Sequence, residues 1–338
     1  MRTYRSAVVG CGDVSIVHLA ALNKSELAGL VAVCDSDPSA LAAATEATGV
    51  AGYATVAELL EQERLDVVHV CTPHDQHAPV VIACLEAGVH VLTEKPLAES
   101  LTAADQIIAA AATSSATLGV CFQNRYNAPV RIAHERLLAG EFGRIVGGAG
   151  IVMWMRAAGY YADKPWRGTW AGSGGGLLMN QAIHTVDLLQ WLLGPVEQVQ
   201  GSAHTRSLAG IIEVEDTAEM LLTHVGGVQS VFYATNSHVR NDPVIVEVVT
   251  EKAVLRIGSE LTITYRNGGT ETISPVQAAS GGRDYWGASH EDLIHDFYSQ
   301  LGRDEPFWID AEEARRSLEI ISAVYDQSFP NRIQHEDK

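Results

Sequence analysis

The sequence has no uninterrupted run of about 20 apolar residues, the length that a helix needs to cross a bilayer. The first residues, MRTYRSAVVG, lead directly into a strand-like run. They lack both the apolar stretch and the small-residue cleavage site of a secretory signal peptide. We therefore expect a cytoplasmic protein with no membrane partner.

Positive charge is also scarce. The chain contains 23 Lys and Arg residues but 41 Asp and Glu residues, which gives a formal net charge of −18. Such an acidic surface repels other polyanions, so we expect no nucleic-acid partner and no anionic lipid partner. A small anionic substrate remains compatible with this charge, because a local arginine cluster outweighs the global field at contact distance.

Cysteine is present at five positions, but none forms a CxxC pair and all lie in the first half of the chain. Cys34, Cys71 and Cys121 end apolar runs, where a small thiol packs well, so we expect reduced packing cysteines and no metal site. The segment HEDLIH at 290–295 resembles a zinc motif, but histidines five apart fall on different helix faces. We expect solvated helix surface there.

The length of 338 residues suits two domains, which we place at 1–124 and 125–338. In the first half, near-continuous apolar strands alternate with helices, as in a doubly wound parallel sheet that is covered on both faces. The expected strands are 6–10, 27–34, 66–71, 89–93 and 117–122, and the expected helices are 13–23, 39–48, 79–87 and 102–112.

The pattern changes after about residue 124. A helix at 128–139, a long strand at 144–155 and a helix at 177–193 precede a succession of strands from 196 to 265, and helices at 289–301 and 311–326 close the chain. Successive strands separated by turn residues indicate a large, mostly antiparallel sheet in an α+β domain. One uncovered face of such a sheet favours a homodimer or homotetramer.

A glycine-rich turn, GCGDVS, lies between the first strand and the first helix. Gly10 permits a tight turn, and Gly12 lets the backbone approach a pyrophosphate at the positive end of the helix dipole. Ser15 occupies the third glycine position and is small enough to permit close packing of the helix on the strand. We therefore expect a Rossmann dinucleotide-binding domain, in which the turn residues Gly10, Cys11, Gly12, Asp13 and Val14 bind the cofactor.

Asp35 ends the second strand, 23 residues after Gly12. An acidic side chain at this place accepts hydrogen bonds from the adenosine ribose and repels a 2′-phosphate. The sequence therefore favours NAD over NADP, although a nearby arginine can override the carboxylate.

Four further segments carry a resemblance to a known family: CTPH at 71–74 with His77, EKP at 94–96, QNRY at 123–126, and GGG at 174–176 followed by NQAIHTVDLLQWLLG. In order and spacing, over nearly the whole chain, the protein resembles the Gfo/Idh/MocA oxidoreductases. The resemblance implies a catalytic lysine at Lys95, a catalytic histidine at His184, and a cis peptide before Pro96. It also implies cofactor contacts at Thr72, Pro73, His74, His77, Glu94, Lys95 and Gln123, with Arg125 near the substrate.

The residues themselves support two of these assignments. Lys95 ends an apolar strand, so it would project into the crevice where doubly wound sheets bind ligands, although exposed lysines are common at strand ends. Asn180, His184 and Asp187 interrupt the apolar helix at spacings of four and three and share one face. Such polar groups need partners, which are either substrate hydroxyls or one another.

Many sugar-oxidising relatives carry Asp where this chain has Asn180, which can neither take a proton nor carry charge. Acid–base chemistry would then fall to His184 and Lys95. The NQxIH variant resembles family branches that act on nucleotide sugars and other substituted pyranoses. Trp166 and Arg167 precede the glycine cluster and could bind a sugar face and an anionic group, although a packed loop is an alternative.

These observations predict an NAD(P)-dependent oxidoreductase, with NAD favoured over NADP, that oxidises a secondary hydroxyl of a sugar, a sugar derivative or a cyclitol. His184 would accept the hydroxyl proton, Lys95 would stabilise the oxyanion, and Asp187 would orient His184 or bind a neighbouring hydroxyl. Two alternatives remain: a redox-neutral enzyme or glycosidase that uses NAD transiently, and a non-catalytic nucleotide and sugar sensor. The presence of both Lys95 and His184 counts against the sensor.

Overall fold

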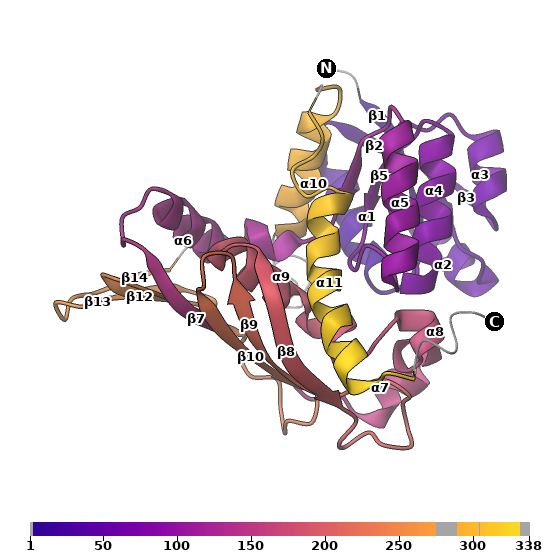
Figure 1. The fold of residues 1–338 in the computed structure, drawn as a ribbon. Helices are drawn as coiled ribbons and strands as arrows, with labels where there is room; N and C mark the ends of the chain where they lie inside the picture. The colour runs from indigo at the N-terminus through magenta and orange to yellow at the C-terminus, as the bar shows by residue number, and fades with distance from the viewer. Residues whose placement is uncertain (1–2, 275–288, 304, 332–338) are drawn as a thin grey trace. The chain divides into compact units, whose positions relative to one another are not determined.

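The computed structural model describes residues 3–274, 289–303 and 305–331, which form two compact units (Figure 1). The first unit contains the described residues up to Gln123 and those from Ser289 to Arg315. The second contains Asn124 to Ser274 and the described residues from Arg316 onward. The segment from Ser289 to Arg315 thus belongs to the first unit, whereas our predicted boundary after residue 124 assigns it to the second domain.

A six-stranded parallel sheet forms the centre of the first unit, in the order β3-β2-β1-β4-β5-β6. The chain order reverses between β1 and β4, which is the place where doubly wound sheets bind their ligands. The prediction of a parallel sheet is confirmed. The strands are β1 (Tyr4–Val9), β2 (Ala28–Cys34), β3 (Ala51–Tyr53), β4 (Val67–Val70), β5 (His90–Thr93) and β6 (Leu118–Val120).

Helices pack on this sheet because its strands are apolar on both faces; Val8, Val68 and Val91, for example, are fully buried. Helix α1 packs against α10, and α4 packs against α5 (Figure 1). The helices of this unit are α1 (Ser15–Lys24), α2 (Pro38–Thr48), α3 (Val56–Gln62), α4 (His77–Glu86), α5 (Leu101–Thr113) and α10 (Ser289–Gln300), with a 3₁₀ turn η1 (His74–Gln76) before α4.

The second unit is built on an eight-stranded sheet in the order β14-β13-β12-β11-β7-β10-β9-β8. Strands β7 and β10 pair in parallel, and the other neighbouring pairs are antiparallel, which confirms the predicted, mostly antiparallel sheet. The strands are β7 (Ile145–Met153), β8 (Val196–His204), β9 (Thr217–His224), β10 (Gln229–Thr235), β11 (Ile245–Thr250), β12 (Ala253–Ile257), β13 (Leu261–Tyr265) and β14 (Thr270–Ile273).

Helix α9 (Ile183–Leu193) packs on β7 and β11, and the glycines of β7 make this close packing possible. A Cβ atom on Gly148 would lie 2.6 Å from Leu193 Cδ2, and one on Gly150 would lie 2.9 Å from Thr185 Cγ2. The other helical elements are η2 (Gln123–Tyr126), α6 (Ala128–Leu138), α7 (Ala158–Ala162), η3 (Pro165–Gly168), α8 (Trp170–Ser173), a π-helical turn η4 (Leu178–Ala182) and α11 (Ala311–Ser328), which carries residues of both units.

Within the described ranges, no helix combines the length and the apolarity needed to cross a membrane. The five cysteines are free thiols, and all except the half-buried Cys11 are buried.

Candidate active site

The glycine-rich turn follows β1, as predicted; its shape requires glycine at position 10 and leaves open space beside Gly12. Gly10 has φ +90°, and a Cβ atom there would lie 2.6 Å from the carbonyl carbon of Cys71, directly after β4. Only glycine fits this position. Around Gly12, by contrast, a Cβ atom would meet no described heavy atom within 4 Å, so the backbone is open to a ligand. The Ser15 hydroxyl donates to the Gly12 carbonyl at 2.7 Å and holds the turn closed.

Asp35 lies at the carboxyl end of β2 and binds this turn. Its Oδ2 accepts the Cys11 N–H at 2.6 Å, and its Oδ1 accepts the Asp37 N–H at 2.8 Å. Each carboxylate oxygen has a further lone pair, so Asp35 can still accept from a ribose hydroxyl. The turn and the half-buried carboxylate together have the form of a dinucleotide site.

The loops after β4 and β5 are joined by His77. Its Nδ1 lies 2.8 Å from the Pro96 carbonyl oxygen, and its Nε2 lies 3.1 Å from that of Thr72. Burial lowers the pKa of His77, against the two carbonyls that favour its charged form. Pro73 precedes η1, and the buried ring of His74 lies against that of His77. His77 therefore braces the loops that carry Thr72 and Lys95.

One polar atom of this region points to a ligand. The Thr72 hydroxyl oxygen is buried and has no hydrogen-bond partner within the described part of the chain. Buried hydroxyls are rarely left in this state, so a bound molecule would satisfy it. The hydroxyl belongs to the loop after β4, at the sheet's switch point.

Lys95 lies two residues after the end of β5, next to Glu94, and is half-buried. A cis peptide bond joins it to Pro96, as the resemblance implies. Glu94 is buried: its Oε1 accepts from His18 Nε2 at 3.0 Å and from His290 Nε2 at 3.2 Å. Burial alone would raise the pKa of Glu94, but the two histidine hydrogen bonds hold it well below its ordinary value. The expectation that His290 is solvated was therefore wrong, whereas His295 is exposed as expected.

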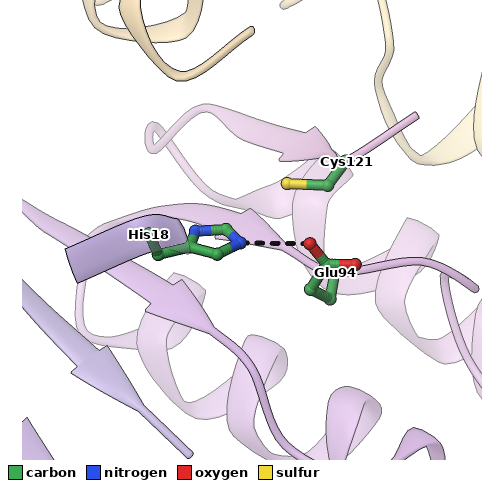
Figure 2. Close-up of side chains that lie close together, drawn as sticks. All are labelled: His18, Glu94 and Cys121. Atoms are coloured by element: carbon green, nitrogen blue, oxygen red, sulfur yellow. Dashed lines mark hydrogen bonds and ion pairs between the residues drawn. The ribbon is translucent and has the colours of Figure 1, made fainter. Parts of the chain in front are cut away.

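Figure 2 shows His18, Glu94 and Cys121, whose side chains converge in the interior of the first unit. One potential ligand atom of each lies within 4.8 Å of the others, so the group could in principle hold a metal ion. The dashed contact between His18 and Glu94 has hydrogen-bond length, however, and burial, the largest influence, raises the pKa of Cys121 well above its ordinary value. A protonated thiol and a protonated imidazole nitrogen favour a hydrogen-bonded cluster.

In the second unit, Glu215 fixes the glycine cluster and the start of the helix that carries Asn180 and His184. Its Oε2 accepts the Gly176 N–H at 2.8 Å, and its Oε1 accepts the Leu178 N–H at 2.8 Å and the Tyr325 hydroxyl at 2.7 Å. A carboxylate at this helix start accepts N–H groups that have no intrahelical partner. Cβ atoms on the two glycines before Leu177 would lie 2.1 Å from the Tyr325 hydroxyl oxygen and 2.0 Å from the Glu215 carbonyl oxygen, which explains the GGG sequence.

Asn180 and His184 lie on η4 and on the first turn of α9, and both are half-buried. Asp187, one turn further along α9, is paired inside the unit with Arg125. Arg125 Nε and Nη2 donate to the two Asp187 oxygens at 2.8 and 2.6 Å, and each side chain is only 1% exposed. The Ser317 hydroxyl also donates to Asp187, at 3.2 Å. The two residues that we expected at the substrate thus satisfy each other.

The loop before the glycine cluster brings aromatic and cationic groups together. The Arg167 guanidinium lies 4.3 Å from the centre of the Tyr160 ring, and that of Arg156 lies 5.4 Å from it. Trp166 is half-buried, and its ring centre lies 5.8 Å from the Arg167 guanidinium. The Tyr160 hydroxyl accepts from Gln181 Nε2 at 3.0 Å, which ties this group to the residue after Asn180.

Sequence reasoning did not identify Glu215, His18 or Tyr160. Glu215 precedes β9 and gave no motif, and its partners are 37 to 110 residues away in the chain. Tyr160 precedes Trp166 and Arg167, for which the sequence left a substrate-binding role and a packing role open. Gln123, expected at the cofactor, is buried at the start of η2.

A nucleotide-binding turn on a doubly wound parallel sheet, followed by a unit with a large antiparallel sheet, defines an NAD-binding oxidoreductase of the two-domain type. The family model described as "Oxidoreductase family, NAD-binding Rossmann fold" matches residues 4–122, and the model of the GFO/IDH/MocA C-terminal domain matches residues 130–256. The chain belongs to the Gfo/Idh/MocA oxidoreductase family.

Several relatives have named activities or ligands. D-Apiose dehydrogenase of Paraburkholderia graminis is 30% identical over 81% of this chain and 73% of its own length. The structure of the WlbA dehydrogenase from Bordetella pertussis, in complex with NADH and UDP-GlcNAcA, is 31% identical with a TM-score of 0.83, covering 98% of this chain and 97% of that one. The WlbA dehydrogenase from Chromobacterium violaceum, with the same two ligands, is 33% identical with a TM-score of 0.83, covering 98% and 95%.

Proposed function

We propose that this protein is an NAD-dependent dehydrogenase that oxidises a secondary hydroxyl of a sugar carrying an anionic group, with a nucleotide-linked uronic acid sugar as the favoured substrate class. The observation that carries this proposal is the similarity, over nearly the whole chain, to two dehydrogenases whose structures contain NADH and UDP-GlcNAcA. The family's other named relatives include sugar and inositol dehydrogenases, so the reaction class does not depend on these two alone.

The residues of the first unit fit the cofactor. The open backbone at Gly12 leaves room for a pyrophosphate. The Asp35 carboxylate can accept from a ribose hydroxyl, and the buried Thr72 hydroxyl is available to hydrogen-bond the bound molecule. The remaining proposed contacts come from the turn residues Cys11, Asp13 and Val14 and from Pro73, His74, His77, Glu94, Lys95 and Gln123. Bound NAD would supply the hydride acceptor. The Asp35 carboxylate would disfavour a 2′-phosphate, so we propose NAD over NADP.

His184 and Lys95 are the proposed catalytic groups. The imidazole of His184 would take the proton of the reacting hydroxyl, and the ammonium of Lys95 would stabilise the oxygen as negative charge develops. Asn180 would hold a neighbouring hydroxyl through its amide, because it cannot exchange a proton. For Asp187 and Arg125 we propose a supporting role: their buried pair holds α9, and with it His184, against η2.

Arg167 and Arg156 support the choice of an anionic substrate. Both lie over the Tyr160 ring in a protein whose net charge is −18, so a local positive site has been built against the global field. Arg156 donates to the Met155 carbonyl and to Asn241, and within the described residues no carboxylate forms an ion pair with it. We propose that Arg167, together with Trp166, binds the charged part of the substrate.

The test is NADH formation by the purified protein with NAD and a panel of UDP-linked uronic acids, neutral nucleotide sugars, free sugars and inositols. Lys95→Ala and His184→Ala should abolish turnover, whereas Lys24→Ala, which removes an exposed lysine, should not. Turnover with neutral sugars but not with uronic acids would contradict the substrate class. Turnover that survives Lys95→Ala would contradict the mechanism. Tightly held NAD without net NADH for any substrate would favour the redox-neutral alternative.

The outer face of the large sheet supports a homo-oligomer. Val231 and Tyr233 of β10 are 56% and 41% exposed, on a strand whose alternate residues are buried. We propose that a second copy covers this face in a homodimer or homotetramer, and that the protein works in the cytoplasm. Light scattering should report an oligomer for the wild type and a smaller species for Val231→Glu with Tyr233→Glu. A monomeric wild type would contradict the proposed assembly.

A further inference from the structure

A chain of buried hydrogen bonds crosses the interior of the first unit and ends on Glu94. Ser6 Oγ lies 2.6 Å from the Tyr298 hydroxyl, which lies 2.9 Å from His69 Nε2. His69 Nδ1 lies 2.8 Å from His18 Nδ1, and His18 Nε2 lies 3.0 Å from Glu94 Oε1. All five residues are at least 96% buried, and they come from β1, α10, β4, α1 and the end of β5.

The protons of this chain can be arranged in only two consistent ways, because a neutral histidine carries one N–H and a phenol one O–H. In the first, every group donates towards Glu94: Ser6 to Tyr298, Tyr298 to His69, His69 to His18, and His18 to an ionised Glu94. In the second, every bond is reversed, and Glu94 must carry an additional proton that it donates to His18. The ionisation of Glu94 and the tautomers of both histidines are therefore coupled.

Three observations select the first arrangement. Glu94 accepts a second bond from His290 and a third from the Lys95 N–H, at 3.3 Å, as a carboxylate would. Burial lowers the pKa of His18 and His69, so both are neutral near pH 7. Burial also raises the pKa of Tyr298, which keeps its hydroxyl proton available for donation.

We propose that Tyr298 and His69 are positioning residues, which hold His18 in its Nε2–H tautomer and thereby keep Glu94 ionised and fixed beside Lys95. A hydroxyl and an imidazole in the core of the unit would thus control the charge next to the lysine. This inference rests on the proposed catalytic role of Lys95.

We expect the Lys95 ammonium to respond to Glu94 because the two residues are adjacent and the Lys95 backbone N–H donates to Glu94 Oε2. Their charges both act on His77 and on Cys121, so the Lys95 ammonium lies within electrostatic reach of the same buried groups. An ionised Glu94 favours the ammonium form of Lys95, and losing this charge would let Lys95 deprotonate at lower pH. The titratable groups that face Glu94 are His18 of α1, His290 of α10, His69 of β4, His77 of α4, Cys71 after β4, Cys121 after β6, and Lys95.

The first experiment reads the tautomers directly and needs no substrate. In protein labelled with ¹⁵N-histidine, the NMR signals of His18 and His69, assigned through His18→Gln and His69→Gln, should show Nε2–H and Nδ1–H tautomers, respectively. Tyr298→Phe, which removes only the donating hydroxyl, should abolish this single-tautomer signature. Ser6→Ala should leave it unchanged, because in the first arrangement Ser6 only donates to the Tyr298 oxygen, and the Tyr298 proton remains bonded to His69. Tyr4→Phe is the matched control: it removes the hydroxyl of the neighbouring ring, which donates to the Leu301 carbonyl and not to the histidines, so the signature should persist.

The second experiment reads Lys95 through its pH-dependent acylation, followed by mass spectrometry, with Lys24 as the internal reference in the same sample. The midpoint for Lys95 should move to lower pH by about one unit or more in Glu94→Gln and by a smaller amount in Tyr298→Phe. It should not move in Ser6→Ala or Tyr4→Phe.

The outcomes separate this inference from the proposed function. The opposite tautomers in the wild type, or an unchanged Lys95 midpoint in both Glu94→Gln and Tyr298→Phe, would overturn the inference. So would stoichiometric Zn²⁺ binding that removes the His18 Nε2 proton. Turnover that persists in Lys95→Ala would instead refute the catalytic role of the lysine, whatever the tautomers are.

Discussion

Glu215 allows a sharp test of how the second unit is stabilised, because a fully buried carboxyl group there accepts three hydrogen bonds. Burial is the largest influence and raises the pKa of Glu215 from 4.5 to about 7, although bonds from Leu178, Tyr325 and Gly176 oppose the rise. The folded protein therefore binds a proton at Glu215 more tightly than the unfolded chain does. The resulting stabilisation is fully present below about pH 4.5 and is lost as the pH rises through about 7.

The magnitude follows from the difference of about 2.5 units between the two pKa values. At about 1.4 kcal/mol per unit, Glu215 contributes about 3.5 kcal/mol less to stability in alkaline solution than in acid. In Glu215→Gln this dependence should vanish. The variant should also be less stable than the wild type in acid. Its amide N–H₂ group would face backbone N–H groups, and a donor cannot accept the hydrogen bonds that these groups give to the carboxyl oxygens of Glu215.

The assay is urea unfolding of the full chain at about pH 5 and about pH 8.5, combined with hydrogen exchange of the peptide that contains Gly176 and Leu178. We expect the wild type to lose about 2.5 kcal/mol relative to Glu215→Gln between these conditions, because part of the full difference is already lost by about pH 5. Exchange at Gly176 and Leu178 should accelerate only in the wild type, after correction for the intrinsic pH dependence. A wild type that gained stability relative to the variant with rising pH would refute the raised pKa of Glu215.

The other predictions concern the cofactor turn and the buried ion pair. Gly10→Ala should abolish NAD binding in calorimetry, because the new Cβ atom would lie 2.6 Å from the Cys71 carbonyl carbon at a φ of +90°; retained affinity would contradict the geometry of the turn. Asp35→Ser should narrow the preference for NAD over NADP by about tenfold or more, measured as the ratio of dissociation constants, and an unchanged ratio would exclude Asp35 from ribose selection. Asp187→Asn should destabilise the protein in urea by about 3–5 kcal/mol, because it leaves the Arg125 charge buried, whereas the double variant with Arg125→Met should lose less; equal losses would argue against a coupled pair.

Local sequence patterns predicted much of the fold and the cofactor turn, because the relevant forces act over short stretches of chain. The tight turn at Gly10 and the acidic end of β2 at Asp35 follow from residues close in sequence, and the structure joins them by a bond between Asp35 and the Cys11 N–H. Strands β3 and β14 gave no clear pattern, because they have only three and four residues and lack buried alternation.

Long-range pairing limits what sequence could predict for the substrate unit. Asp187 has the helical spacing of a site residue, yet its partner Arg125 is 62 residues away and buries both charges. The π-helical turn η4 also changes the register between Asn180 and α9, so a count of 3.6 residues per turn does not hold there. His290 is a similar case. The sequence predicted that its side chain is exposed to solvent, but the side chain is buried against Glu94, which lies 196 residues away in the chain.

Glu94 and Glu215 show that burial alone does not decide the charge of a carboxyl group. Both are fully enclosed, yet hydrogen bonds bring the pKa of Glu94 well below its ordinary value, while burial keeps that of Glu215 raised to about 7. The difference lies in the donors: two imidazoles, those of His18 and His290, donate to Glu94, whereas backbone N–H groups and a phenol donate to Glu215. Between about pH 6 and about pH 8, Glu215 should therefore change its charge while Glu94 does not. Hydrogen exchange at Gly176 should follow this titration, and the tautomers of His18 should stay constant across the same range. If the two changed together, the carboxyl groups would not titrate independently, and the assignment of a permanently ionised Glu94 would fail.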